Sequence, residues 1–230
     1  MASSTLLTEY AVTLYEMTIT RSLRVKWLAA ELGILDDITL RPVALLNREQ
    51  YQAPFKALNP MSAVPLLCLT HKETKEDTLV TESAAICHLL TDQIPTGSDF
   101  KPPATDIPAY AAYHRWIAFA AASMDSILWQ IRLNEQLLPE KMRSATAAKV
   151  ARNTFLKKVV PTLEQVFEGG AEFVCEPHWA GFSTADIMVG YACRWSMWYG
   201  LLDDSPVLLA YVERVMARKQ FKRVFGDGKL

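Results

Sequence analysis

The spacing of apolar residues changes near the middle of the chain, and no other feature of the sequence constrains the fold as strongly. Up to residue 93, short β-prone runs alternate with helical patterns. Beyond residue 108, apolar residues recur at three- and four-residue steps, which is the spacing of amphipathic helices. The sequence therefore predicts an α/β part followed by an all-helical part.

The first part reads as strand, helix and strand, followed by a hairpin and another helix. Gly33 suits the C′ position that ends the first helix. The β-prone runs cover residues 11–15, 38–43, 64–69 and 78–81, and helical spacing covers 22–32 and 83–90.

A proline-rich segment, residues 94–108, separates this part from the helical one. It contains four prolines, one glycine and two aspartates, a composition that suits an exposed connection. The helices expected beyond it cover 110–131, 142–167 with a kink or division at Pro161, a segment from 184 onward, and 206–217. We therefore expect two domains, residues 1–93 and 109–230, with 94–108 as the linker.

Composition and charge narrow the class of protein. Half of the residues are apolar and the net charge is −1, so the chain suits a packed protein without an electrostatic footprint for nucleic acid or an anionic membrane. The first residues lack the basic flank and the long apolar run of a secretory signal, and no later run reaches spanning length. We expect a cytoplasmic protein that binds small molecules, without nucleic-acid or membrane partners.

Cysteines and histidines predict neither a disulfide framework nor a metal site. The four cysteines are far apart, contain no Cys-x-x-Cys pair and have apolar neighbours, which favours free buried thiols: Cys68, Cys87, Cys175 and Cys193. The four histidines lack metal-ligand spacing, so no metal is expected.

Two short motifs carry the most specific information. Residues 59–66 read N-P-M-S-A-V-P-L, and residues 82–86 read E-S-A-A-I, beginning seventeen residues after Pro65. With L-Y at 14–15, R-V at 24–25, E-L-G at 31–33 and F-S-T-A-D at 182–186, they resemble the cytosolic glutathione transferase family in order and spacing. The resemblance implies a thioredoxin-like βαβ-α-ββα domain that binds glutathione, an all-helical bundle domain, and a homodimer.

The Val64-Pro65 motif suits a backbone binding site. A cis bond before proline costs only about 0.5–1 kcal/mol, so this pair can hold an unusual turn at a strand start, although an ordinary trans proline fits as well. In the family resembled, the backbone of the residue at Val64 binds the cysteinyl part of glutathione as an added strand does. Gln52 or Arg48 is then expected to hold the glycine end.

The Glu82-Ser83 motif suits a carboxylate site at a helix start. Backbone N–H groups, the helix dipole and the Ser83 hydroxyl can converge on the γ-glutamyl carboxylate, and Glu82 would face the ammonium group. The alternative is that Ser83 is an N-cap and Glu82 a solvated acid. Ser183 and Asp186, by contrast, have the spacing of a capping box, which serves stability.

The loop between the first strand and the first helix would activate the thiol. Family members place a Tyr, Ser or Cys there, but residues 16–22 contain no Tyr and no Cys. Thr20 is the hydroxyl that we expect to donate to the thiolate, with Thr18 as a second candidate, Ser22 as the helix N-cap and Arg21 as an electrostatic aid. Absence of cysteine disfavours redox chemistry through a mixed disulfide.

An apolar electrophile needs its own pocket. Tyr113, His114, Trp116 and Trp129 on the long helix, with Met17 near the loop, could wall it, although aromatic residues at helical spacing are more often core. The expected function is a glutathione transferase that catalyses conjugation or glutathione-assisted isomerisation, with glutathione as co-substrate. The alternative is a non-enzymatic binding module of the same fold.

Overall fold

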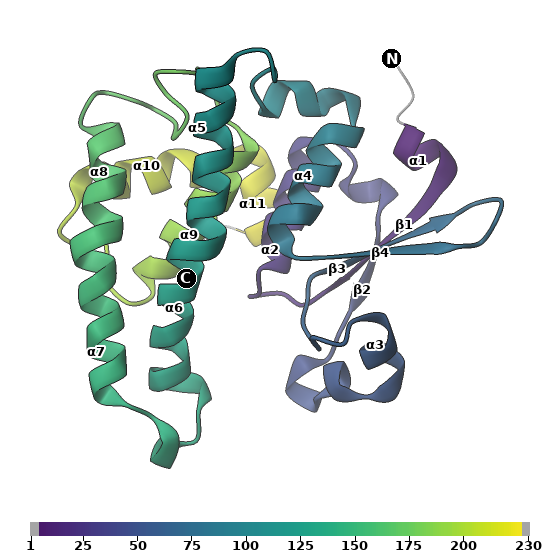
Figure 1. The fold of residues 1–230 in the computed structure, drawn as a ribbon, viewed down its shortest axis with the longest axis horizontal. Coiled ribbons are helices and arrows are strands. Elements are labelled where there is room, and N and C mark those ends of the chain that lie inside the picture. The colour runs from purple at the N-terminus through teal and green to yellow at the C-terminus, as the bar shows by residue number, and fades with distance from the viewer. Residues whose placement is uncertain (1–4, 227–230) are drawn as a thin grey trace. The chain divides into compact units, whose positions relative to one another are not determined.

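The computed structural model describes residues 5–226, which form two compact units (Figure 1). The first unit comprises the chain up to Phe100 together with helix α11 (Lys219–Phe225). The second unit runs from Lys101 to Arg218 and is helical. The expected fold class, an α/β part followed by helices, is confirmed. The domain limits expected above stay a prediction.

The first unit is built on a mixed sheet. Within residues 5–226 the strand order is β2-β1-β3-β4, with β1 parallel to β2 and antiparallel to β3, and β3 antiparallel to β4. The strand bounds lie within two residues of those predicted: β1 Tyr10–Glu16, β2 Thr39–Pro42, β3 Leu66–His71 and β4 Asp77–Thr81.

Helices in this unit follow the predicted periodicity in two cases. Gly33 has φ +78°, a conformation that suits glycine, and it ends α2 as predicted. The predicted helices are α2 (Ser22–Glu31) and α4 (Ser83–Gln93), whereas α1 (Thr5–Glu9) and α3 (Ala53–Leu58) were not predicted.

Helix α11 differs from the prediction, which placed all residues beyond 109 in the helical domain. Phe221 lies with its ring centroid 5.0 Å from that of Trp27 on α2, and Phe225 stacks on Phe221 at 4.1 Å. Arg223 also forms an ion pair with Asp36. These contacts explain why α11 belongs to the first unit.

The second unit contains one long helical run and an antiparallel return. The predicted long helix is α5 (Ile107–Ala118), a π-helical segment (Phe119–Met124) and α6 (Asp125–Arg132). The predicted helix 142–167 is α7 (Ala145–Thr154), a π-helical segment (Phe155–Val159) and α8 (Val160–Phe167). Pro161 lies near the start of α8, and because proline has no N–H to donate, the π-helical segment ahead of it is the predicted interruption.

Helix α9 (Thr184–Met197) forms the centre of the helical core, and nearly all of its residues are buried. Its predicted capping box is confirmed: Ser183 N and Ser183 Oγ both donate to Asp186 Oδ2, at 2.9 and 2.8 Å. Asp186 Oδ1 accepts from Val174 N at 2.9 Å and from the Tyr211 hydroxyl at 3.1 Å. One carboxylate thus ties the start of α9 to the preceding loop and to α10 (Pro206–Met216).

Among residues 5–226, no helix has both the length and the apolar character needed to cross a lipid bilayer.

Candidate functional site

Strand register brings three loop segments to the same end of the sheet, where β1 and β4 end and β3 begins. We call this end of the strands the sheet edge. Tyr15, next to the end of β1, pairs with Leu66, the first residue of β3, and Leu66 pairs with Thr81, the last residue of β4. The segment that follows β1, the one that precedes β3 and the one that follows β4 must therefore lie side by side. Glu16 pairs with Pro42 at the end of β2, so the segment after β2 reaches the same edge.

Val64 and Pro65 lie just outside the ladder, and the bond between them is cis, which excludes the alternative of an ordinary trans proline. The paired residues of β3 begin at Leu66, so the Val64 backbone is beyond the last ladder pair. The Val64 side chain packs on Val43 and Phe55 in a buried cluster. This anchoring holds the Val64 backbone at the sheet edge outside the ladder, where a peptide-like ligand can pair with it.

Asn59 has a role that the sequence analysis missed. Its side chain is buried, donates from Nδ2 to Ala63 O at 2.8 Å and accepts from Met61 N at 3.0 Å. These bonds hold the turn before Val64. The first letter of the N-P-x-x-x-V-P motif could have suggested this, since asparagine commonly bonds to backbone groups in turns.

Glu82 and Ser83 form the start of α4. Glu82 occupies the N-cap position with φ +66° and ψ +116°, an unusual conformation for a residue other than glycine. Ser83 is the first helical residue, so the alternative that Ser83 is the N-cap is wrong. The Ser83 side chain is nearly buried, and no hydrogen bond of its hydroxyl to another residue occurs within residues 5–226. The first N–H groups of an eleven-residue helix lie beside it, which suits an anion.

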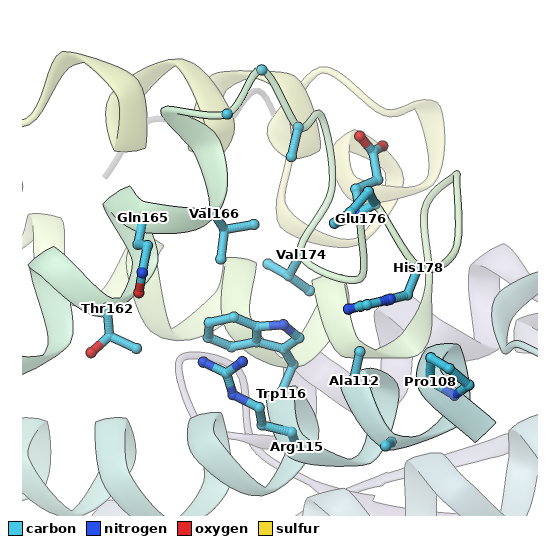
Figure 2. Close-up of a pocket in the computed structure, with 15 residues that line it drawn as sticks. Pro108, Ala112, Arg115, Trp116, Thr162, Gln165, Val166, Val174, Glu176 and His178 are labelled. Carbon is cyan, nitrogen blue, oxygen red and sulfur yellow. The ribbon is translucent and has the colours of Figure 1, made fainter.

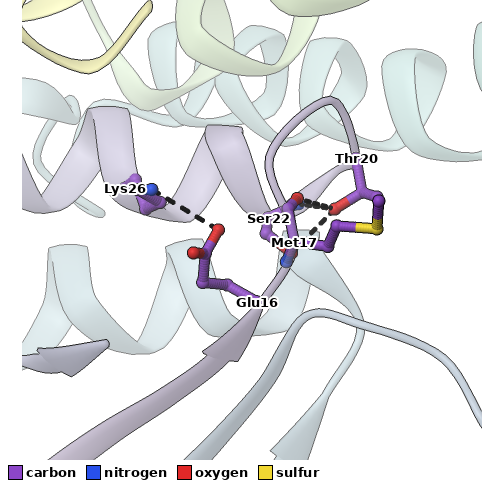
Figure 3. Close-up of polar contacts among 5 residues, drawn as sticks. All are labelled: Glu16, Met17, Thr20, Ser22 and Lys26. Atoms are coloured by element: carbon purple, nitrogen blue, oxygen red, sulfur yellow. Dashed lines mark hydrogen bonds and ion pairs between the residues drawn. The ribbon is translucent and has the colours of Figure 1, made fainter. Parts of the chain in front are cut away.

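Thr20 sits in a small hydrogen-bond network after β1 (Figure 3). Its Oγ1 donates to Met17 O at 2.6 Å and lies 2.9 Å from Ser22 Oγ, which accepts from Met17 N at 3.4 Å. A hydroxyl has one proton, and the short bond to the Met17 carbonyl uses that of Thr20. A thiolate would therefore have to compete with this carbonyl for the proton.

The roles of the neighbouring hydroxyls differ from the prediction. Arg21, not Ser22, occupies the N-cap of α2, and Ser22 is fully buried as its first residue. The helix begins one residue earlier than predicted because the turn from Met17 already bends the chain, with Leu23 N donating to Thr20 O at 3.1 Å. Thr18 is exposed and stays a candidate donor.

Ile19 is the conformational outlier of this loop. It has φ +68° and is half exposed, although a β-branched residue is strongly disfavoured at positive φ. Thr20 N donates to Met17 O at 3.3 Å, so Ile19 takes the third position of a tight turn, where glycine or asparagine is usual. The turn that directs Thr20 is thus strained.

A buried acid also lies at this edge and was not predicted. Glu16, the last residue of β1, is nearly inaccessible and pairs with Lys26 of α2, with 3.4 Å between Nζ and Oε2 (Figure 3). The pair fixes the strand end from which the Thr20 loop departs. In the sequence, the only indication of this buried acid is a glutamate at the end of an apolar strand.

Arg48 and Gln52 are exposed residues in the segment between β2 and β3. Arg48 has φ +61°, and its guanidinium lies 5.9 Å from the centroid of the Tyr51 ring. Gln52 is the N-cap residue of α3. Both side chains are accessible to a ligand carboxylate, and their part in binding the glycine end stays a prediction.

The five residues predicted for the electrophile pocket have different surroundings, and Trp129 is exposed on α6. Tyr113 and Trp116 are buried in the helical unit, where His114 lies 4.3 Å from Tyr110 between ring centroids. Met17 packs on the cluster that contains Val64 in the first unit. That these residues wall an electrophile pocket stays a prediction.

The cysteines are free and buried, as predicted, and burial disfavours the thiolate form by raising the pKa of each. Burial raises the pKa of the Cys87, Cys175 and Cys193 thiols to about 12. Within residues 5–226, no three His, Cys, Asp or Glu side chains gather as metal ligands would. A thiol nucleophile at this edge would therefore have to belong to a bound molecule.

Comparison with known proteins agrees with this geometry. Residues 20–93 match the family model described as glutathione S-transferase, N-terminal domain. A search of curated protein sequences finds no match.

Many solved structures share the fold of this chain at low sequence identity. A glutathione transferase from Phanerochaete chrysosporium in complex with oxidized glutathione is similar with a TM-score of 0.79 and 20% identity, over 95% of this chain and 96% of that one. A family member from Pseudomonas fluorescens with two glutathione bound gives 0.79 and 16% over 94% and 92%. A transferase from Populus trichocarpa gives 0.77 and 19% over 95% and 100%. The chain thus has the glutathione transferase fold along its length.

Proposed function

We propose that this glutathione transferase-like chain binds glutathione at the sheet edge and activates its thiol for attack on an apolar electrophile. The observation that carries the proposal is the register that sets Tyr15, Leu66 and Thr81 side by side. It brings the open backbone at Val64 next to the first turn of α4, as a γ-glutamyl tripeptide requires. The complexes of similar proteins with glutathione support the ligand.

Each part of glutathione then has a partner of suitable chemistry. The backbone of Val64 pairs with the cysteinyl residue, and Ser83 with the N-terminus of α4 binds the γ-glutamyl carboxylate. Glu82 faces the ammonium group. Arg48 and Gln52, both exposed, bind the glycine carboxylate.

Thiol activation depends on an exchange of hydrogen bonds at Thr20. The neutral bond from Thr20 Oγ1 to Met17 O is worth about 0.5–1.5 kcal/mol, whereas a bond to a charged acceptor is worth about 1.5–3. The hydrogen bond from Thr20 to a nearby thiolate is therefore more favourable than the bond to Met17 O by roughly 1 kcal/mol. Ser22, 2.9 Å from Thr20 Oγ1, then acts as a positioning residue.

The same network supports the alternative, a non-enzymatic binding module. If the Thr20 proton stays on the Met17 carbonyl, the other side-chain hydroxyls of the loop are those of Thr18 and Ser22, because residues 16–22 contain no Tyr or Cys. Conjugation and glutathione-assisted isomerisation both require a donor to the thiolate, and a binding module does not.

We further propose two domains, residues 1–93 and 109–230, joined by a linker at 94–108, with the exception that α11 belongs to the first compact unit. We also propose a cytoplasmic homodimer. The proposed electrophile pocket is walled by Met17, Tyr113, His114 and Trp116.

Retention on immobilised glutathione, followed by turnover of a chlorodinitrobenzene electrophile, tests the function. Retention with turnover supports the transferase, and retention without turnover supports the binding module. If the chain is not retained, or if free glutathione does not elute it, the result would contradict a glutathione site in either the transferase or the binding module.

A further inference from the structure

The helical unit contains a cavity of about 800 Å³ between α5, α8 and the loop that follows α8 (Figure 2). Its origin is a set of small residues that face one another and leave the space unfilled. These are Ala111 and Ala112 on α5, and Gly169, Gly170 and Ala171 after α8. Small-molecule pockets typically measure about 300–1,000 Å³, so the space suits a ligand of that class.

Arg115 supplies a positive charge to this cavity. Its guanidinium carbon lies 4.5 Å from the centroid of the Trp116 ring, and Trp116 is only 2% exposed, so the charge rests on a fixed aromatic surface. No hydrogen bond or ion pair links the Arg115 side chain to another residue of the part of the chain that the structure describes. Its N–H donors are therefore available.

His178 adds a second available donor. Figure 2 shows its imidazole reaching from the loop toward Trp116, on the side opposite Arg115. Its backbone N–H bonds to Cys175 O at 3.1 Å, and within residues 5–226 the ring nitrogens have no hydrogen-bond partner.

The carboxylate in the cavity lining does not pair with Arg115 or His178. Glu176 directs its carboxylate away from Trp116 in Figure 2, and its Oε2 accepts from Glu172 N at 3.0 Å. This bond joins two residues of the loop that follows α8. Thr162 is likewise occupied, since its hydroxyl donates to Lys158 O at 2.6 Å.

We propose that this cavity binds a small organic carboxylate with a flat apolar body. The planar guanidinium of Arg115 matches a carboxylate, and His178 offers a further donor on the other side of Trp116 (Figure 2). Val166 and Val174, with the two alanines of α5, contact the apolar body. The site goes beyond the proposed function: it lies in the second unit, uses none of the residues proposed to bind glutathione, and shares only Trp116 with the proposed electrophile pocket.

Calorimetric titration with 2-naphthoate and its neutral isostere 2-naphthamide, in saturating glutathione at pH 7, tests the proposal. We expect 2-naphthoate to bind about tenfold or more tightly than the amide, because a charge-assisted bond is worth about 1.5–3 kcal/mol. Arg115→Met should abolish this preference and leave the amide unaffected, while Arg115→Lys retains part of it. Ala112→Leu should weaken both ligands by filling the cavity.

The matched control is Lys157→Met, which removes a positive charge from an exposed position of the same unit. It should leave both affinities unchanged, and melting curves should show that every variant is folded. Equal affinity for the acid and the amide would overturn the proposal. So would absence of saturable binding at millimolar concentration, an unchanged preference in Arg115→Met, or competition between 2-naphthoate and glutathione.

Discussion

At the residue scale, the chemistry of the sheet edge depends on one hydroxyl and the turn that directs it. Thr20 was predicted from its place in the loop, but its bond to the Met17 carbonyl was not. That bond depends on the left-handed conformation of Ile19, which sequence patterns do not predict for a β-branched residue. Glu16 was missed because Lys26 becomes its partner only in the folded protein, whereas the partners of Asn59 are two and four residues away and its role in a turn could have been predicted.

Thr20→Val should abolish or severely reduce thiol transfer while glutathione affinity stays nearly intact. The change keeps the shape and removes a donor worth about 1.5–3 kcal/mol to a charged acceptor, so the bound thiol should titrate about one to two pKa units higher. Ultraviolet titration of the thiolate in the complex measures this shift. Thr18→Val is the matched control, and a shift in that variant alone would reassign the donor to Thr18.

Ile19→Gly should stabilise the protein. A residue other than glycine in a sparsely populated backbone region costs about 1–3 kcal/mol, and the added freedom of the unfolded chain offsets roughly 0.4–1 of this gain. Urea unfolding should show a rise of about 1 kcal/mol, whereas Ile19→Val, which keeps the strain, should show none. A less stable glycine variant would mean that the exposed side chain contributes more than its conformation costs.

At the element scale, the starts of helices were easier to predict from the sequence than the contacts between elements. The capping box at α9 was predicted because Ser183 and Asp186 are local partners. The bonds from Val174 and Tyr211 to the same carboxylate join segments far apart in the chain, and no local pattern predicts them. Helix α11 was missed as a part of the first unit because only folding brings Phe221 to Trp27.

Asp186 should give the protein a measurable pH dependence. Burial raises the pKa of this carboxyl to about 6, although hydrogen bonds from Val174, Ser183 and Tyr211 oppose the shift. The unfolded value is about 3.9, so between about pH 4 and 6 the folded state binds more protons. The free energy of unfolding contributed by Asp186 is therefore highest below pH 4 and falls as pH rises to 6, by on the order of 3 kcal/mol.

Urea unfolding of the natural chain and of Asp186→Asn at several pH values isolates this contribution. The variant should be less stable at low pH and should lack this fall between pH 4 and 6. Parallel pH profiles for the two proteins would show that Asp186 does not change its protonation state there.

At the scale of the whole molecule, two periodicities sufficed to predict the architecture. Alternating strands and helices gave the sheet with its β1-α2-β2 unit, and three- and four-residue steps gave the helical unit. The Val64-Pro65 and Glu82-Ser83 motifs identified the edge of the sheet. The electrophile pocket could not be predicted in this way, because the same three- and four-residue spacing fits side chains that lie in the core and side chains that line a pocket.

The proposed homodimer is a property of the whole chain. Light scattering at micromolar concentration should give twice the chain mass of 25.8 kDa. A mass that stays at that of one chain as the concentration rises would contradict the dimer.

The central claim is that glutathione binds between the Val64 backbone and the start of α4. Calorimetric titration of glutathione into the natural chain, Ser83→Ala and Ser98→Ala tests it most directly, because Ser98 is an exposed serine of the same unit that follows the C-terminal end of α4. We predict saturable binding that is about ten- to a hundredfold weaker in Ser83→Ala, from loss of a hydrogen bond to a charged group, and unchanged in Ser98→Ala. Equal affinities in the two variants, or no saturable binding by the natural chain, would contradict the account.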